Sequence, residues 1–184
     1  NYSILFRPIG GNSIIDIRSD TIYPAASVNK LPVLFGLYVL VNSQIVDLNT
    51  RITVQDSDIQ DYGTGILRYQ GAGNAYQLKT LAEIMIQKSD NTAGYILYNH
   101  IIGVDRMEEL LQQWNLTQTN LILNETSNSD LYILMEKIYT GTITNPAQSK
   151  EMLSFLKNTD FEDRLPGLLP ENVHVYHKIG NGEI

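Results

Sequence analysis

Apolar residues recur at helical spacing in several long stretches of the chain. Within 78–88, positions 78, 81, 82, 85 and 86 are apolar, so these residues share one face of a helix. The same spacing predicts further helices over four stretches: 92–102, 104–114, 129–139 and 146–157. A longer run, 27–41, is apolar almost all round and predicts a buried helix.

Short segments near both ends of the chain have the pattern of strands. Stretches 2–6 and 13–17 flank turn-forming residues that include Gly10 and Gly11, which predicts a β-hairpin. Residues 173–178 alternate between apolar and polar and predict a later strand. The glycine-rich stretch 61–73 is expected to form a loop.

This order of elements indicates an α+β fold. We expect one antiparallel sheet built from both chain ends, 1–26 and about 166–184, with a mainly helical region at about 27–165 inserted between them. At 184 residues the chain is one domain or most of one.

Composition narrows the class of protein. The formal net charge of -7 argues against a nucleic-acid partner, which calls for a basic face. The absence of cysteine excludes disulfides and thiolate metal sites. His100, His174 and His177 lack the spacing of a metal site, so we expect no metal. The longest apolar run, 31–41, is too short to span a bilayer, so no transmembrane segment is expected.

Candidate chemistry begins at Ser27, at the start of the apolar helix. Lys30 follows three positions later, so both side chains lie on one helix face about one turn apart. A lysine whose charge is suppressed can take the proton of a serine hydroxyl. Each residue also has a purely structural interpretation, Ser27 as a helix N-cap and Lys30 as a surface lysine with its stem on apolar surface.

Two later segments add polar residues to this pair. Ser89, Asp90 and Asn91 precede the predicted helix 92–102, where any of them could also cap the helix. Lys178 ends the predicted strand 173–178 and is followed by Ile179 and Gly180; it could also be an ordinary edge-strand lysine.

In combination, the Ser-x-x-Lys, Ser-Asp-Asn and Lys-x-Gly segments resemble those of class A β-lactamases and penicillin-binding proteins. The resemblance covers nearly the whole chain, from the hairpin to Gly182. It implies a sheet flanked by helices, an all-helical lobe and an active site between them. The family continues with further strands after the lysine, so we expect a chain that is incomplete at its C-terminus, or a second segment or chain that completes the sheet.

The resemblance assigns catalytic roles to three residues. It implies that Ser27 is the nucleophile, that Lys30 is the general base, and that Ser89 relays a proton to the leaving nitrogen. In the family such a reaction forms an acyl-serine intermediate, and the resemblance implies that no metal or organic cofactor is needed.

Three further residues take binding roles by the same resemblance. Asn91 would hold Lys30 and the substrate amide, and Lys178 would attract a substrate carboxylate. The backbone N–H groups of Ser27 and Asn181 would form the oxyanion hole. Ile179 departs from the family, which usually has threonine or serine there, and carboxylate recognition is expected to be poorer.

A second departure concerns hydrolysis of the acyl-enzyme. By separation from Ser89, Glu125 is the candidate water activator, but the E-x-x-L-N pattern of the family is absent and the long loop looks deleted. We therefore expect Glu125 to start the next helix, with its carboxylate outside the cleft, and deacylation to be impaired.

These observations predict a β-lactamase-related serine hydrolase that acts on a β-lactam or a D-alanyl peptide outside the cytoplasmic membrane, in the periplasm, secreted or anchored. One alternative is a cell-wall D-alanyl peptide hydrolase or transpeptidase that β-lactams inhibit. Another is a binding module that keeps the fold without catalysis.

Overall fold

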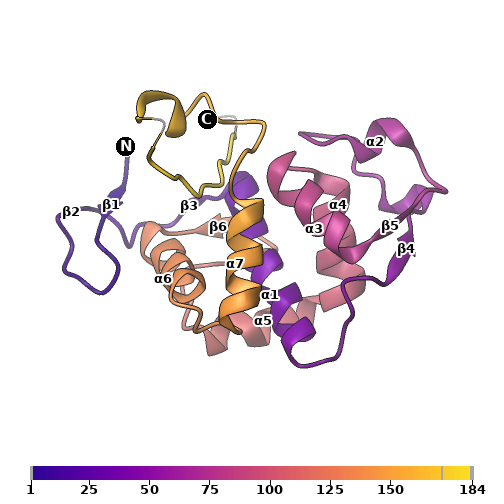
Figure 1. Cartoon of the computed structure of the whole chain (residues 1–184), viewed down its shortest axis with the longest axis horizontal. Coiled ribbons are helices and arrows are strands. Elements are labelled where there is room, and N and C mark those ends of the chain that lie inside the picture. Colours follow the sequence, from indigo (N-terminus) through magenta and orange to yellow (C-terminus); the bar gives the residue numbers. More distant parts are fainter. Residues whose placement is uncertain (1, 171, 183–184) are drawn as a thin grey trace.

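The structure is a computed structural model that describes residues 2–170 and 172–182. Helix α1 (Lys30–Asn42) runs through the middle of the molecule, with the other long helices around it (Figure 1). Its side chains Leu34, Phe35, Leu37 and Tyr38 are fully buried, as the apolar run predicts. Burial of such side chains is the main stabilising contribution to a fold of this kind.

The helices around α1 present one apolar face to it. They are α3 (Leu78–Gln87), α4 (Asn91–Tyr95), α5 (Val104–Gln113), α6 (Asn128–Tyr139) and α7 (Pro146–Phe155), with the short α2 (Leu67–Gln70) at the surface. The described part of the chain also has three 3₁₀ turns: η1 (Ala26–Asn29) before α1, η2 (Asp56–Asp58) before α2 and η4 (Pro166–Leu168) after α7. In the described ranges no helix is long and apolar enough to cross a membrane.

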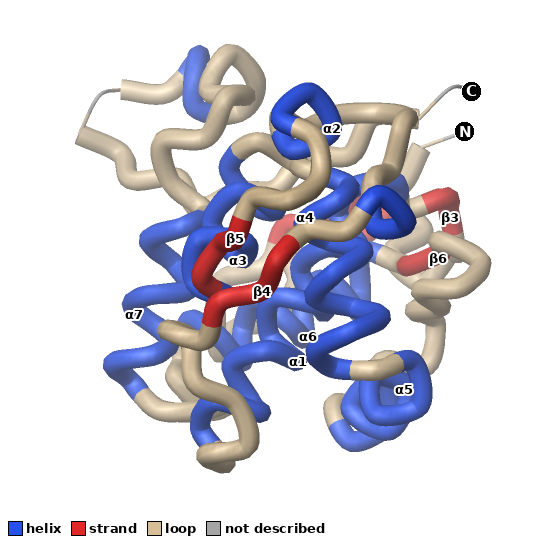
Figure 2. The backbone as a smooth tube through the Cα atoms, turned by 90° about the vertical axis from the view of Figure 1, so that its right-hand side faces the viewer, coloured by secondary structure: helices blue, strands red, loops and turns tan. Residues whose placement is uncertain are grey.

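Within residues 2–170 and 172–182, three antiparallel ladders of two strands each lie at the edges of this bundle. They are β1 (Ile4–Phe6) with β2 (Ile15–Ile17), β3 (Tyr23–Pro24) with β6 (Glu125–Thr126), and β4 (Arg51–Thr53) with β5 (Ala75–Gln77). The predicted N-terminal hairpin is the first of these ladders, with Leu5 opposite Asp16. Figure 2 shows β4 and β5 on the surface beside α3, which follows β5 directly.

The structure corrects three details predicted from the sequence. Residues 173–178 form no strand; the His177 N–H instead donates to the Leu156 carbonyl at the end of α7. Alternation alone does not form a strand, because each strand needs a neighbour to complete its ladder. The expected loop 61–73 contains helix α2. The single helix expected over 92–102 is divided into α4 and the π-helix η3 (Ile96–Ile102).

Candidate active site

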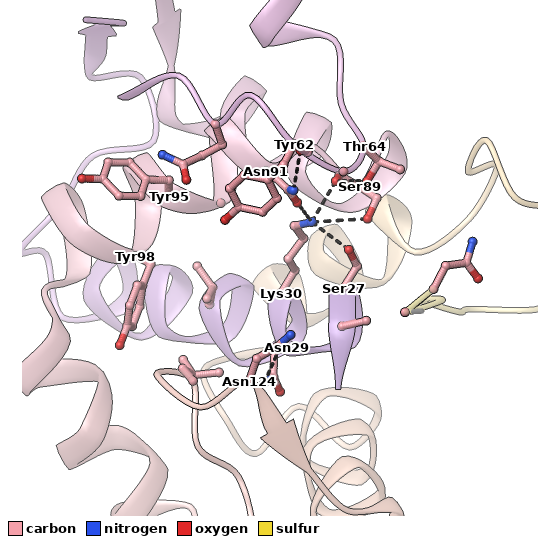
Figure 3. Close-up of a pocket in the computed structure, with 18 of the residues that line it drawn as sticks. Ser27, Asn29, Lys30, Tyr62, Thr64, Ser89, Asn91, Tyr95, Tyr98 and Asn124 are labelled. Carbon is pink, nitrogen blue, oxygen red and sulfur yellow. Dashed lines mark hydrogen bonds between the residues drawn. The ribbon is translucent and has the colours of Figure 1, made fainter. Parts of the chain in front are cut away.

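The three sequence motifs meet around Lys30 Nζ and Ser89 Oγ. Lys30 Nζ lies 2.9 Å from Ser27 Oγ and 3.4 Å from Ser89 Oγ. It also contacts the Ser89 carbonyl oxygen at 2.8 Å and Asn91 Oδ1 at 2.6 Å (Figure 3). From the other side, Lys178 Nζ donates to Ser89 Oγ at 2.9 Å. A nucleophile, a basic nitrogen and a second hydroxyl thus lie within hydrogen-bond reach of one another.

Ser27 is placed by the turn η1 that precedes α1. The preceding Ala26 has φ of +48°, a left-handed conformation that is uncommon for a residue with a side chain and that clusters at functional sites. Ser27 is not a helix cap: the N-cap positions of η1 and α1 are Ala25 and Asn29, and neither start has a side-chain cap. The Ser27 hydroxyl instead forms a hydrogen bond with Lys30.

Asp90 fixes the loop that carries Ser89. One carboxylate oxygen accepts from the backbone N–H groups of Ile66 and Leu67, and the other accepts from that of Ala93 and caps α4. Gly65 passes so close that a Cβ there would lie 2.4 Å from the Asp90 carboxylate, and its φ of +127° also requires glycine. Asp90 thereby joins the 62–67 loop to the α3–α4 turn.

The segment after Lys178 lies against the nucleophile. A Cβ on Gly180 would come within 2.6 Å of the Ala25 carbonyl oxygen and 3.2 Å of the Ser27 backbone nitrogen, so only glycine permits this approach. The next residue, Asn181, lines the same cavity as Ser27. Segment 178–182 thus reaches the expected position without forming a strand.

Burial changes the charge of both lysines. It lowers the pKa of Lys30 to about 8, an effect that the Asp90 carboxylate partly opposes. It also lowers the pKa of Lys178 to about 7, and the positive charge of Lys30 adds to this shift. Near neutral pH the pair therefore carries less than two full positive charges.

The hydrogen-bond partners are compatible with the neutral form of Lys30, which predominates above its pKa of about 8. A neutral amine has two N–H donors and one lone pair. The Ser89 carbonyl and Asn91 Oδ1 can only accept, and the orientation of the Asn91 amide is fixed because its Nδ2 donates to the Tyr62 carbonyl at 2.9 Å. The lone pair then remains for the hydroxyl of Ser27, which can donate its proton.

A pH dependence follows from this arrangement. We expect the acylation rate constant to rise about tenfold per pH unit below a midpoint near the Lys30 pKa of about 8, and then to level off, because only the neutral amine accepts the proton. Rapid mixing with a chromogenic β-lactam from about pH 6 to about pH 10 measures this. A rate that falls through this range as pH rises would contradict the assignment.

The cluster opens into a cavity with a volume of about 540 Å³. Its lining includes Leu121, Ile122 and Asn124, which precede β6. Among the described residues that line it, none is aspartate, glutamate or histidine. The prediction that Glu125 starts a helix is wrong. Glu125 lies in β6 opposite Pro24, and α6 starts at Asn128. That long-range pairing has no local signal in the sequence.

The sequence analysis missed several residues around this cavity. Thr64 Oγ1 donates to the Ser89 carbonyl at 2.7 Å, and Asn29 Nδ2 donates to Asn124 Oδ1 at 3.0 Å. Tyr95 and Tyr98 also line the cavity. They lie four and seven positions after Asn91, a spacing that puts all three on one helix face and could have revealed them.

The histidines lie apart from the nucleophile. His100 Nε2 lies 2.9 Å from the buried carboxylate of Asp58, and His177 Nε2 lies 3.0 Å from Glu162. No group of three His, Cys, Asp or Glu side chains within the described ranges is arranged to hold a metal ion.

Comparison with known proteins agrees with the class of site that the fold and the serine–lysine cluster define. The model of the beta-lactamase enzyme family matches residues 1–183. The chain belongs to this family. The resemblance and the fold class predicted from the sequence are thereby confirmed, with helices predominating over small antiparallel ladders.

Two solved structures of PBP-A are 30% identical to this chain. One is a mutant in an acyl-enzyme complex with penicillin G, with a TM-score of 0.87. The match covers 96% of this chain and 69% of the PBP-A chain. The other has a TM-score of 0.84, and the match covers 91% of this chain and 66% of the PBP-A chain.

Curated relatives give the same family. Beta-lactamase BRO-1 of Moraxella catarrhalis is 25% identical over 90% of this chain, and Beta-lactamase 1 of Bacillus cereus is 29% identical over 85%. The chain spans only 57% and 54% of the length of these relatives.

Proposed function

We propose that the domain is a serine acyl-transfer enzyme that forms an acyl-serine intermediate with a β-lactam or a D-alanyl peptide. The observation that carries the proposal is the convergence of Ser27, Lys30 and Ser89 within hydrogen-bond reach. Family membership and the penicillin complex of PBP-A support the substrate class. Such substrates are found outside the cytoplasmic membrane, so we place the activity there.

The proposed proton path starts at Ser27. Lys30 takes the hydroxyl proton as Ser27 Oγ attacks the carbonyl carbon, so that the new C–O bond forms while the negative charge moves to the carbonyl oxygen. The backbone N–H groups of Ser27 and Asn181 stabilise that oxygen. When the C–N bond breaks, Ser89 Oγ passes a proton to the leaving nitrogen and recovers one from Lys178 or Lys30, both of which it contacts.

Substrate binding is assigned to two side chains. Asn91 holds Lys30 through Oδ1, and its Nδ2 faces the loop that forms the cavity wall. Lys178, whose Nζ donates to Ser89 Oγ at 2.9 Å, attracts a substrate carboxylate. With Ile179 beside it, no hydroxyl at position 179 assists that contact.

Hydrolysis of the acyl-enzyme is proposed to be slow. The cavity lining described above has no carboxylate or imidazole to activate a water molecule. General-base help is typically worth roughly 10²–10⁴-fold, so its loss leaves a long-lived adduct. This favours the penicillin-binding alternative, a wall D-alanyl peptide hydrolase or transpeptidase, over an efficient β-lactamase.

We therefore expect nitrocefin to give a burst of about one equivalent followed by little turnover. Glu125→Gln should leave the burst and the later rate unchanged, with Glu109→Gln on α5 as the matched control. Rapid steady-state hydrolysis that Glu125→Gln abolishes would restore Glu125 as the deacylation base. The absence of any burst would favour the non-catalytic binding module.

A further inference from the structure

The cavity extends beyond the serine–lysine cluster along α4 and the π-helix η3. We call this extension the tyrosine arm; the polar residues that line it are Gln60, Tyr95, Tyr98 and Asn99. Figure 3 shows Tyr95 and Tyr98 on the side of the cavity away from Ser27. Val33 and Leu121 add apolar surface to the lining. π-Helical turns are rare and often occur at functional sites, and this one carries Tyr98 and Asn99.

Several polar atoms of the tyrosine arm have no partner within the protein. The Gln60 amide donates to the Asp58 carbonyl at 3.2 Å, and the Asn99 amide donates to the Tyr95 carbonyl at 3.1 Å. In the described part of the chain, no donor reaches the carboxamide oxygen of either residue, and the phenol oxygens of Tyr95 and Tyr98 have no hydrogen bond either. Acceptors and donors of both kinds are therefore left for a ligand.

The arm is also uncharged. None of its four polar residues is an acid or a base at neutral pH, since burial and the nearby Glu108 raise the pKa of Tyr98 and keep its phenol protonated. Two charged residues lie close to Gln60 in the chain, and neither lines the cavity: Asp58 has a buried carboxylate that contacts His100, and Asp61 is exposed. The two site lysines make their hydrogen bonds inside the cluster. A charged ligand group would lose its hydration in the arm without gaining a partner of opposite charge.

We propose that the tyrosine arm binds the acyl side of the substrate, and that it takes an uncharged peptide segment several bonds away from the carbonyl that Ser27 attacks. This rests on the proposed function. Carboxamides and phenols match the N–H and C=O groups of a peptide, and the apolar walls match its neutral side chains. The cavity of about 540 Å³ lies within the usual range for ligand sites, about 300–1,000 Å³, which leaves room for more than the scissile bond.

Three benzyl thioesters with the same leaving group test this specificity. They carry acetyl-D-alanine, acetyl-alanyl-glutaminyl-D-alanine, and the same tripeptide with glutamate in place of glutamine. The burst of released thiol gives the saturating acylation rate and the half-saturation concentration for each. We expect the half-saturation concentration of the neutral tripeptide to be about tenfold lower than that of acetyl-D-alanine. The half-saturation concentration of the glutamate-containing tripeptide should be close to that of acetyl-D-alanine.

Matched variants locate the contact. Tyr98→Phe removes one hydroxyl from the arm, and Tyr139→Phe removes one from an exposed tyrosine on α6 as the control. We expect Tyr98→Phe to raise the half-saturation concentration of the neutral tripeptide about threefold to tenfold, the effect of one hydrogen bond. Its saturating rate, and both values for the short donor, should not change.

Three results would overturn the inference in different ways. Bursts from all three donors with equal half-saturation concentrations in the wild-type protein would contradict the tyrosine arm as a peptide site and leave the proposed function standing. No burst from any donor, and none from nitrocefin, would contradict the proposed function together with the inference. The preference for the neutral tripeptide could also remain in both Tyr98→Phe and Asn99→Ala. That result would contradict the tyrosine arm as its site and place the peptide elsewhere in the cavity.

Discussion

Lys30→Arg should lower the rate of Ser27 acylation by roughly 10²–10⁴-fold, the usual contribution of a general base. Arginine keeps a positive charge on a long side chain, but it cannot be deprotonated in a protein. It therefore cannot accept the serine proton, whereas Lys30 has its pKa lowered to about 8 by burial. Lys30→Ala should lose acylation to a similar degree. Stopped-flow measurement of the nitrocefin burst gives the rate.

The control for Lys30→Arg is Lys150→Arg, the same replacement at an exposed position of α7. Circular dichroism of each variant shows whether the helices are retained. If Lys30→Arg is acylated as fast as the wild-type protein, Lys30 is not the base, and the neutral-amine arrangement of its hydrogen bonds has no catalytic meaning.

Asp90→Ala is expected to lower the free energy of unfolding by at least about 3 kcal/mol, the low end for three lost donors. The Asp90 side chain is 1% exposed and accepts hydrogen bonds from three backbone N–H groups. Its removal leaves these buried donors without a partner, and each unsatisfied group costs about 1–3 kcal/mol. Urea unfolding followed by circular dichroism measures the change.

Asp160→Ala is the matched control for Asp90→Ala. Asp160 is half-exposed and pairs with Lys88 at the surface, where such ion pairs contribute about 0–1 kcal/mol. Equal, small losses in the two variants would mean that Asp90 does not brace the loop that carries Ser89. A large loss only in Asp90→Ala is the expected result.

The helical part of the fold could be predicted from the sequence because the apolar faces of its helices repeat at the helical period. The predicted stretch 78–88 became α3 (Leu78–Gln87), and 129–139 became α6 (Asn128–Tyr139). Two of the predictions that were wrong concern strands, whose formation depends on pairing between distant segments. The alternating stretch 173–178 has no ladder partner among the described residues, and β6 exists only because Glu125 pairs with Pro24.

The convergence of the motifs could also be predicted, since Ser27, Lys30 and Ser89 belong to segments of recognisable spacing. The walls of the cavity that loops carry into place could not. Gly180 belongs to the recognised Lys-x-Gly segment, but its close approach to the Ser27 backbone arises only in the fold. Asn124 meets Asn29 across 95 positions of sequence.

The most direct test of the account is the intact mass of the protein after incubation with penicillin G. We predict a gain equal to one whole penicillin molecule, which persists for many minutes and maps to the peptide that contains Ser27, with no gain in Ser27→Ala. A wild-type protein that gains no mass, or a Ser27→Ala variant that gains the same mass, would contradict the assignment of Ser27 as the acylated nucleophile.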